Sequence, residues 1–369
     1  MKHVLRCVRQ GFHALDSRFP SLVWPFALSF FKLHAASARF SQRKPNAIDV
    51  LPWPIPLHEP VRQIRIACIL DEFSAGCFAP EAEFIHLSAK CWQREIEADR
   101  PDFLLVESAW RGLAGDWHLL ISHYSRFRRN PLRDLLGWCR ENGVKTVFWN
   151  KEDPPNFDHF IDAAKDFDHI FTTDADCITR YREICGHDRI HALPFAAGPT
   201  IHNPVRSDAT ALRADVCFAG TWYGDKFPER CKTLTMMLDA ALKYDLHIFD
   251  RKYGHPGARY RFPARFQSRI KGSMSYDRML TAFRAYRVFL NTNSVMTSPT
   301  MFARRVFELL ACGTPVVSSP SRGMEAMLGD FVRVAWQRSF GTKKTRSISI
   351  PSSRLLECAI SFSRPRSTK

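Results

Sequence analysis

The chain has 369 residues, which at about 100–200 residues per domain corresponds to two domains with additional segments. Hydrophobic residues make up 45% of the composition, which excludes a disordered chain over most of its length. The net charge is +16, but it is concentrated at the ends. Residues 1–65 hold ten Lys and Arg against three Asp and Glu, and residues 336–369 hold eight against one. The central region is nearly neutral, which argues against a nucleic-acid-binding domain.

The cysteine pattern and the hydropathy indicate where such a chain would work. Eleven cysteines occur without any C-x-x-C pair, which favours reduced thiols over a zinc ribbon or a disulfide framework. The sequence contains no apolar run of about 18 residues, so no transmembrane helix is expected. These features predict a cytoplasmic protein.

Residues 1–61 are expected to form a basic amphipathic helix followed by a linker. Apolar residues recur at helical spacing over residues 1–19, with lysine and arginine on the other face. Two interpretations remain open: peripheral contact with the inner face of a membrane, or a helix packed on the protein's own surface. Four prolines between residues 52 and 60 predict the linker.

From residue 64 onward, short apolar strands alternate with helical stretches. The first run predicts strands at 64–70, 102–106, 144–149 and 168–173, with helices at 131–142 and 176–185. The second predicts strands at 214–220, 246–250, 287–291, 314–319 and 331–336, with helices at 226–244, 276–286 and from 321. Such alternation is typical of parallel sheets covered by helices.

We therefore expect an α/β protein with two Rossmann-like domains, 62–195 and 196–335, facing a cleft. Open parallel sheets bind ligands at the carboxyl ends of their strands. Residues 336–369 are rich in serine and arginine without a clear period, and are expected to be a disordered or truncated tail.

The stretch "FARRVFELLACGTPVVSS" places charged residues among apolar ones just before a strand. On a helix, Arg304 and Glu308 would lie on one face. One interpretation is a surface ion pair between them. The other is a ligand site, since arginine binds phosphate bidentately and a carboxylate accepts hydrogen bonds from ribose hydroxyls.

This stretch resembles the donor-nucleotide signature of GT-B glycosyltransferases, E-x-x-A-x-G-x-P-V, with Glu308, Ala311, Gly313, Pro315 and Val316 in register. More narrowly, the chain resembles the CgeB-like (spore maturation protein) family of bacterial glycosyltransferases. The matching stretches include "ILDEF", "PDFLLVESAWRG", "VFWNKEDPPNFDHF" and "CFAGTWYGDKFPER". They extend in order over residues 66–324.

The resemblance implies a GT-B fold and a hexosyltransferase-like activity that uses a UDP- or dTDP-sugar, without a metal or another cofactor. It implies a surface-glycan, lipid-linked or protein acceptor, and no nucleic-acid partner is expected. Many GT-B enzymes carry a second glutamate eight residues before the ribose-binding one, where this chain has Thr300. The donor-binding residues expected here are Gly220, Lys226, Arg230, Asn291, Asn293, Arg304, Arg305 and Glu308.

Carboxylates at the predicted strand ends of the first half could activate an acceptor hydroxyl. Glu107, Glu152 and Asp153 are the candidates, with Asp71 and Glu72 behind them; the competing interpretation is that they cap helices or hold loops. The triplet "DAD" at 174–176 matches a D-x-D metal motif, but we expect Asp174 to be a helix N-cap.

Two other functions remain open. One is a non-catalytic relative that binds or assembles at a surface, favoured by Thr300 and the unusual tail. The other is a different α/β enzyme, such as an epimerase or a dehydrogenase. It would require a glycine fingerprint that "ILDEFSAG" does not supply.

Overall fold

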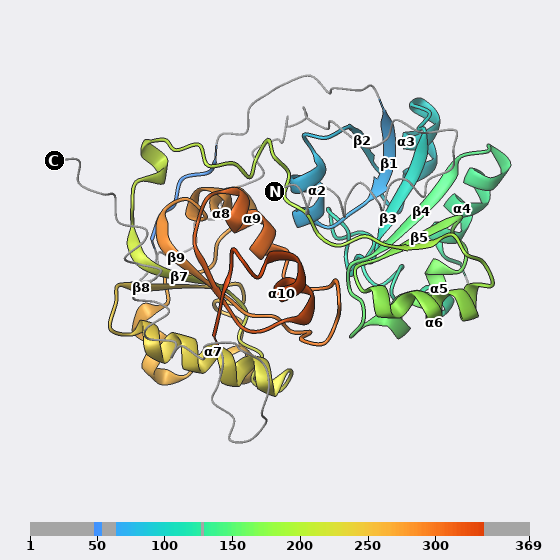
Figure 1. The fold of residues 1–369 in the computed structure, drawn as a ribbon. Coiled ribbons are helices and arrows are strands. Elements are labelled where there is room, and N and C mark those ends of the chain that lie inside the picture. Colours follow the sequence, from blue (N-terminus) through green and yellow to red (C-terminus); the bar gives the residue numbers. More distant parts are fainter. Residues whose placement is uncertain (1–47, 54–63, 127–128, 336–369) are drawn as a thin grey trace. The chain divides into compact units, whose positions relative to one another are not determined.

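A computed structural model describes residues 48–53, 64–126 and 129–335. These residues form two compact units (Figure 1). The first contains residues 64–201 together with Ser298–Met301. The second contains residues 48–53, 202–297 and 302–335. The predicted helix at 1–19 and the tail at 336–369 lie outside the described residues.

The first unit is built on a six-stranded sheet in which every neighbouring pair of strands is parallel, in the order β2-β1-β3-β4-β5-β6. Its strands are β1 (Arg65–Ile69), β2 (Glu83–His86), β3 (Phe103–Glu107), β4 (Lys145–Asn150), β5 (His169–Thr172) and β6 (Ile190–Ala192). Its helices are α2 (Glu72–Phe78), α3 (Trp92–Ala98), α4 (Pro131–Glu141), α5 (Phe157–Ala164) and α6 (Ile178–Cys185).

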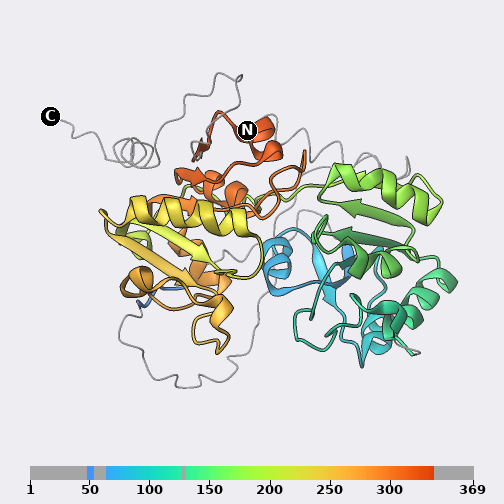
Figure 2. The ribbon, with the colours of Figure 1, turned by 90° about the horizontal axis from the view of Figure 1, so that it is seen from below.

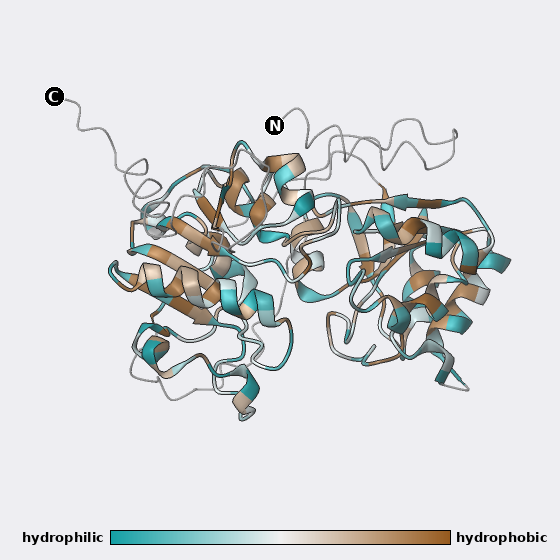
Figure 3. Ribbon diagram, turned by 60° about the horizontal axis from the view of Figure 1, so that its bottom comes forward, coloured by the Kyte–Doolittle hydropathy of each residue, from teal (hydrophilic) through white to brown (hydrophobic). Residues whose placement is uncertain are grey.

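Both faces of this sheet are covered, which explains why its strands are continuously apolar. Alternate strand residues such as Ala67, Leu104 and Phe148 share one core with α3, α4, α5 and α6. The residues between them, such as Cys68, pack with α2 on the opposite face. Successive strand side chains point to opposite faces, so burial on both sides requires apolar residues at every position. Figure 3 shows the resulting hydrophobic strands.

The second unit contains a five-stranded parallel sheet in the order β11-β10-β9-β7-β8. Its strands are β7 (Ala214–Gly220), β8 (Leu246–Asp250), β9 (Tyr286–Asn291), β10 (Val316–Ser318) and β11 (Arg333–Val334). Its helices are α7 (Pro228–Ala241), α8 (Tyr276–Ala282), α9 (Arg305–Ala311) and α10 (Arg322–Leu328). Helix α7 lies along one face of this sheet (Figure 2), where Leu234 and Leu238 pack against Val216 and Ile248.

Each sheet has a point where the strand order reverses. In the first sheet the chain moves from β1 to β2 on one side, and β3 then pairs with the other side of β1. In the second sheet β7 is flanked in the same way by β8 and β9. Ligands of open α/β sheets bind at such switch points, beyond the carboxyl ends of the strands. The relevant strand ends are therefore those of β1 and β3, and those of β7 and β9.

The predicted class, two parallel α/β sheets, is confirmed, and several boundaries needed correction. Helix α7 begins at Pro228 rather than at residue 226, because Phe227 has a positive φ of 59° and proline suits the first helical position. The helix predicted at 276–286 ends at Ala282, and Tyr286 already belongs to β9. Strands β2 and β6 and the short helices α2, α3 and α5 were not predicted.

Part of the predicted linker is packed against the second unit. Trp53 N donates to the Asp277 carbonyl oxygen over 3.1 Å, and Val50 and Trp53 are buried. The guanidinium carbon of Arg284 lies 3.8 Å from the Trp53 ring centroid. Residues 48–53 are therefore a structural part of this unit.

Candidate functional site

At the switch point of the second sheet, a guanidinium group lies against the end of β7. Helix α9 begins at Arg305, and its Nη1 donates to the Ala219 carbonyl oxygen. Its Nε is buried and has no hydrogen-bond partner within the described part of the chain. Burial lowers the pKa of Arg305, and the positive charge of Arg251 lowers it further, while Glu308 opposes the shift. A partly buried, incompletely satisfied cation is a favourable point for an anion to bind.

A second arginine, Arg230, is buried and belongs to the same site. Its Nη1 donates to the Thr221 carbonyl oxygen over 3.0 Å, and its guanidinium carbon lies 5.1 Å from the Tyr223 ring centroid. Burial lowers the pKa of Arg230, and the charge of Arg305 contributes in the same direction. The sheet edge therefore holds positive charges that repel one another, which a bound anion would relieve.

Glu308 is buried in the same unit, with only 3% of its surface exposed. Tyr276 donates its hydroxyl hydrogen to Glu308 Oε1 over 2.9 Å, and His202 Nε2 lies 3.8 Å from the same oxygen. Arg304 precedes α9 instead of lying within it. The interpretation of Arg304 and Glu308 as an ion pair on the surface is therefore wrong, because the carboxylate of Glu308 is buried.

Both predicted asparagines lie at the carboxyl end of β9, and both are buried. Asn293 is engaged by its loop: its Nδ2 donates to the Ser319 carbonyl oxygen over 2.9 Å, and its Oδ1 accepts from Ala303 N over 3.0 Å. Asn291 Nδ2 donates to Ser318 Oγ over 2.9 Å. Asn291 Oδ1 is buried without a hydrogen-bond partner in the residues that the structure covers.

Two other predicted donor contacts lie on the loop after β7. Gly220 ends the strand, and a Cβ there would approach Phe218 Cζ to 3.0 Å, so a larger residue would disturb the strand end. Lys226 is exposed, and its Nζ lies 4.8 Å from the Phe227 ring centroid. Lys226 thus differs from the two arginines in being solvated.

At the switch point of the first sheet, three charged residues come together from three strand ends. Lys151 Nζ lies 2.8 Å from Asp71 Oδ2 and 2.8 Å from Glu107 Oε1. Glu107 Oε1 also accepts a hydrogen bond from Asp71 N. Glu107 is fully buried, whereas the Asp71 side chain is 25% exposed. The cluster therefore presents Asp71 to solvent and keeps Glu107 behind it.

The other two catalytic candidates follow β4. Asp153 is fully buried and accepts hydrogen bonds from Asn150 Nδ2 over 2.8 Å, Thr172 Oγ1 over 2.6 Å and the Tyr181 hydroxyl over 3.0 Å. Burial raises the pKa of Asp153 to about 7, while the hydrogen bonds from Thr172 and Tyr181 act against the shift. Glu152 is only partly buried and accepts from Asn156 Nδ2 over 2.6 Å. Of these two carboxylates, Glu152 is the one closer to solvent.

Thr300 belongs to the first unit. Its Oγ1 donates to the Thr173 carbonyl oxygen over 2.8 Å and accepts from Ala175 N over 2.9 Å. Nearby, Ser298 Oγ donates to Asp174 Oδ1 over 2.6 Å. The same carboxylate accepts from Asp176 N over 3.1 Å, which confirms the predicted N-cap.

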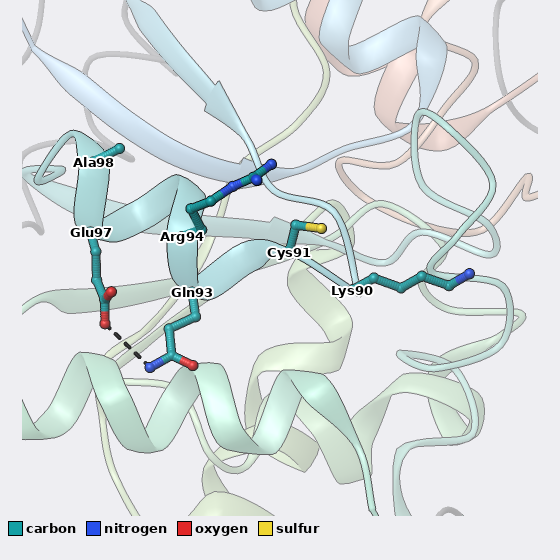
Figure 4. Close-up of a pocket in the computed structure, with 6 residues that line it drawn as sticks. All are labelled: Lys90, Cys91, Gln93, Arg94, Glu97 and Ala98. Carbon is teal, nitrogen blue, oxygen red and sulfur yellow. Dashed lines mark hydrogen bonds between the residues drawn. The ribbon is translucent and has the colours of Figure 1, made fainter.

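Other kinds of site differ from these clusters in what the described residues offer. Within the described ranges, no group of three or more His, Cys, Asp or Glu side chains is arranged to hold a metal ion. Among the described helices, none combines the length and apolar character needed to cross a membrane. A surface hollow of about 620 Å³ lies over α3 (Figure 4) and contains none of the predicted site residues. It is lined by Lys90, Cys91, Gln93, Arg94, Glu97 and Ala98.

Comparison with protein families bears on the region that holds Arg305 and Glu308. Residues 232–340 match a family model described as "Glycosyl transferase-like". The C-terminal part of the chain is thus glycosyltransferase-like in sequence. A search of curated proteins found no match.

Several solved structures are similar to the chain. Anabaena HepE in complex with UDP is 12% identical, with 81% of this chain and 90% of that chain covered and a TM-score of 0.44. AviGT4, a glycosyltransferase involved in avilamycin A biosynthesis, is 13% identical, with 81% and 91% covered and a TM-score of 0.41. UDP-N-acetylglucosamine 2-epimerase from Rickettsia bellii is 10% identical, with 62% and 74% covered and a TM-score of 0.36.

The sequence pattern did not single out two residues around Glu308. These residues are His202 and Tyr276. Both are buried, and both contact the carboxylate of Glu308 or each other. They are 106 and 32 residues away from Glu308 in the chain, so no local motif links them to it.

Proposed function

We propose that the chain is a GT-B-type glycosyltransferase that moves a sugar from a nucleoside diphosphate to an acceptor hydroxyl. The observation that carries this proposal is Arg305, a partly buried arginine at the carboxyl edge of the second sheet, whose buried Nε has no hydrogen-bond partner among the described residues. The same residue lies in the glycosyltransferase-like region. Anions favour such a position, because it combines positive charge with a low local dielectric.

The diphosphate would lie across the end of β7, near Gly220, Arg230 and Arg305. Arginine offers several N–H groups in a fixed plane, which suits two adjacent phosphates. Stabilising the leaving diphosphate is the main electrostatic requirement of the reaction, and buried guanidinium groups can meet it without a divalent cation. Lys226 and Arg304 would add charge from the edge of the site. Asn291 and Asn293 would shape the sugar-facing side.

The ribose would lie against Glu308, whose carboxylate can accept hydrogen bonds from the sugar hydroxyls. Its distance from solvent favours this function, since a hydrogen bond to a charged group is stronger away from bulk water. We expect a UDP- or dTDP-linked donor.

A carboxylate of the first unit would take the proton of the acceptor hydroxyl as its oxygen attacks the anomeric carbon and the nucleoside diphosphate departs. Glu107, Glu152 and Asp153 remain the proposed catalytic residues. Glu152 is the more accessible of them. Glu107 and Asp153 are both fully buried.

Three narrower expectations belong to this proposal. The enzyme would be a hexosyltransferase of the CgeB-like family, acting on a surface-glycan, lipid-linked or protein acceptor. It would work in the cytoplasm, with residues 1–19 providing peripheral contact at the membrane. If those residues bind lipid, deleting residues 1–40 should reduce co-sedimentation with membranes and leave donor binding unchanged.

Isothermal titration of UDP and dTDP into the full chain, in the presence of EDTA, tests the proposal. We expect binding by the wild type and its loss in Glu308→Ala. Glu325→Ala is a matched control, because Glu325 lies on α10 and its Oε1 accepts from Ser321 N over 3.2 Å. If the wild type bound neither these nucleotides nor GDP, the proposal would fail.

A non-catalytic binding protein is the second candidate, and Thr300 favours it. The second glutamate of many GT-B enzymes is replaced by a side chain that is hydrogen bonded to Thr173 and Ala175. A protein that binds nucleotide but neither hydrolyses nor transfers any sugar from a panel of UDP- and dTDP-sugars would support this function.

A further inference from the structure

Two buried side chains face Oε1 of the Glu308 carboxylate. Tyr276 donates to Oε1 over 2.9 Å, and His202 Nε2 lies 3.8 Å from the same oxygen. The His202 and Glu308 side chains are 0% and 4% exposed, respectively. The polar atoms of this group are thus removed from bulk water. A hydrogen bond that is lost here would not be replaced by one to water.

The direction of the hydrogen bonds follows from the number of protons. A tyrosine hydroxyl has one hydrogen, and Tyr276 gives it to Glu308. His202 Nε2 lies 3.0 Å from the same hydroxyl oxygen, so this nitrogen must be the donor. The order is therefore His202 Nε2–H to Tyr276 O–H to Glu308 Oε1, and the histidine fixes the direction in which the tyrosine points.

The three side chains come from three separate segments of the second unit. His202 is its first residue after the chain leaves the first unit, Tyr276 begins α8, and Glu308 lies in α9. A glutamate has three side-chain torsions, and fixing them before a ligand arrives lowers the entropic cost of binding. Contacts from two other segments restrict the carboxylate more firmly than its own helix could.

We propose that Tyr276 and His202 are positioning residues that orient the Glu308 carboxylate and thereby set its recognition of the ribose hydroxyls. This inference rests on the proposed function, in which Glu308 contacts the ribose. With Oε1 engaged by Tyr276, Oε2 is the oxygen proposed to accept from the ribose hydroxyls. Tyr276 and His202 themselves act through Glu308.

The test compares UDP with its 2′-deoxy and 3′-deoxy analogues by isothermal titration. A hydrogen bond between a hydroxyl and a carboxylate corresponds to about tenfold or more in affinity, so at least one analogue should bind wild type about tenfold more weakly than UDP. In Tyr276→Phe, the affinity for UDP should fall, and the ratio of the affinity for UDP to that for the deoxy analogue should shrink to less than about threefold. This ratio is called the deoxy gap below. His202→Asn should also reduce the deoxy gap.

Tyr286→Phe is the matched control, since Tyr286 is also a buried tyrosine of this unit whose hydroxyl meets a histidine, His247, at 3.0 Å. The deoxy gap of Tyr286→Phe should equal that of wild type. A general loss of packing would weaken UDP and the analogues alike, so an undiminished deoxy gap in both Tyr276→Phe and His202→Asn overturns the inference.

The two proposals fail in different ways. If wild type binds UDP and both deoxy analogues equally, the inference is wrong while nucleotide binding stands. If wild type binds none of UDP, dTDP and GDP, the proposed function is wrong, and the inference falls with it.

Discussion

Lys151 Nζ lies 2.8 Å from Oε1 of Glu107, a carboxylate with no exposed surface. The lysine side chain is itself only 10% exposed. Removing one partner of a buried ion pair leaves the other charge uncompensated, which is far more costly than losing a surface pair.

Lys151→Met should therefore lower the free energy of unfolding by about 3–5 kcal/mol, as measured by urea denaturation. The control is Lys165→Met, which breaks a 3.0 Å pair with Asp162 in which both side chains are more than 40% exposed. That change should cost less than about 1 kcal/mol. Equal effects of the two substitutions would contradict the arrangement described for Lys151.

Arg305 and Lys226 should contribute unequally to nucleotide binding. Arg305→Gln is expected to lower the affinity for UDP by about tenfold or more and to leave the affinity for uridine unchanged, because the guanidinium would contact phosphate. Lys226→Gln should have an effect of about threefold or less, since its ammonium group is solvated and screened. Titration of both ligands measures this difference. A larger loss of UDP affinity in Lys226→Gln would reverse the order of the two cations.

Glu81 should make the stability of the first unit depend on pH. Burial raises its pKa to about 8, above the value of about 4.3 in an unfolded chain. The folded state therefore holds a proton that the unfolded state has lost, and stability is greatest below the unfolded pKa. It should fall by up to about 1 kcal/mol per pH unit as the pH rises from about 4.3 to 8, and not beyond.

Glu81→Gln, which cannot ionise, is the variant that checks this dependence. Thermal unfolding at pH 5 and pH 8 should differ less in the variant than in wild type. Glu83→Gln, at a residue two positions along, serves as the control and should keep the wild-type difference. An unchanged pH dependence in Glu81→Gln would count against a raised pKa at this position.

The segment 48–53 should stabilise the second unit through Trp53. Trp53→Ala removes a buried ring that contacts Arg284, and we expect a loss of about 3–5 kcal/mol. Leu51→Ala, in the same segment, changes a side chain that is 54% exposed and should cost less than about 0.5 kcal/mol. Chemical denaturation followed by circular dichroism would measure both. A Trp53 effect as small as that of Leu51 would show that this segment contributes little.

Much of the fold could be predicted from the sequence because each sheet strand carries its own signal. Strands buried on both faces are continuously apolar, as in "VKTVFW" and "ADVCFAG", and the intervening helices supply the alternation of a parallel sheet. The short strand β2 escaped prediction because none of its residues is buried. Likewise, α2 and α3 span only seven residues each, too few for a helical period to appear.

The sequence by itself determined two α/β units, the strand ends that carry Gly220, Glu107 and Asn291, and the motif around Glu308. These are local features, because strand periodicity and motif spacing are properties of neighbouring residues. The tertiary structure alone decided which charges are enclosed and which are solvated. It buried Arg230, exposed Lys226, and joined Tyr276 and His202 to Glu308. Those outcomes depend on contacts between residues far apart in the chain, and no local pattern encodes which side chains will share the same interior space.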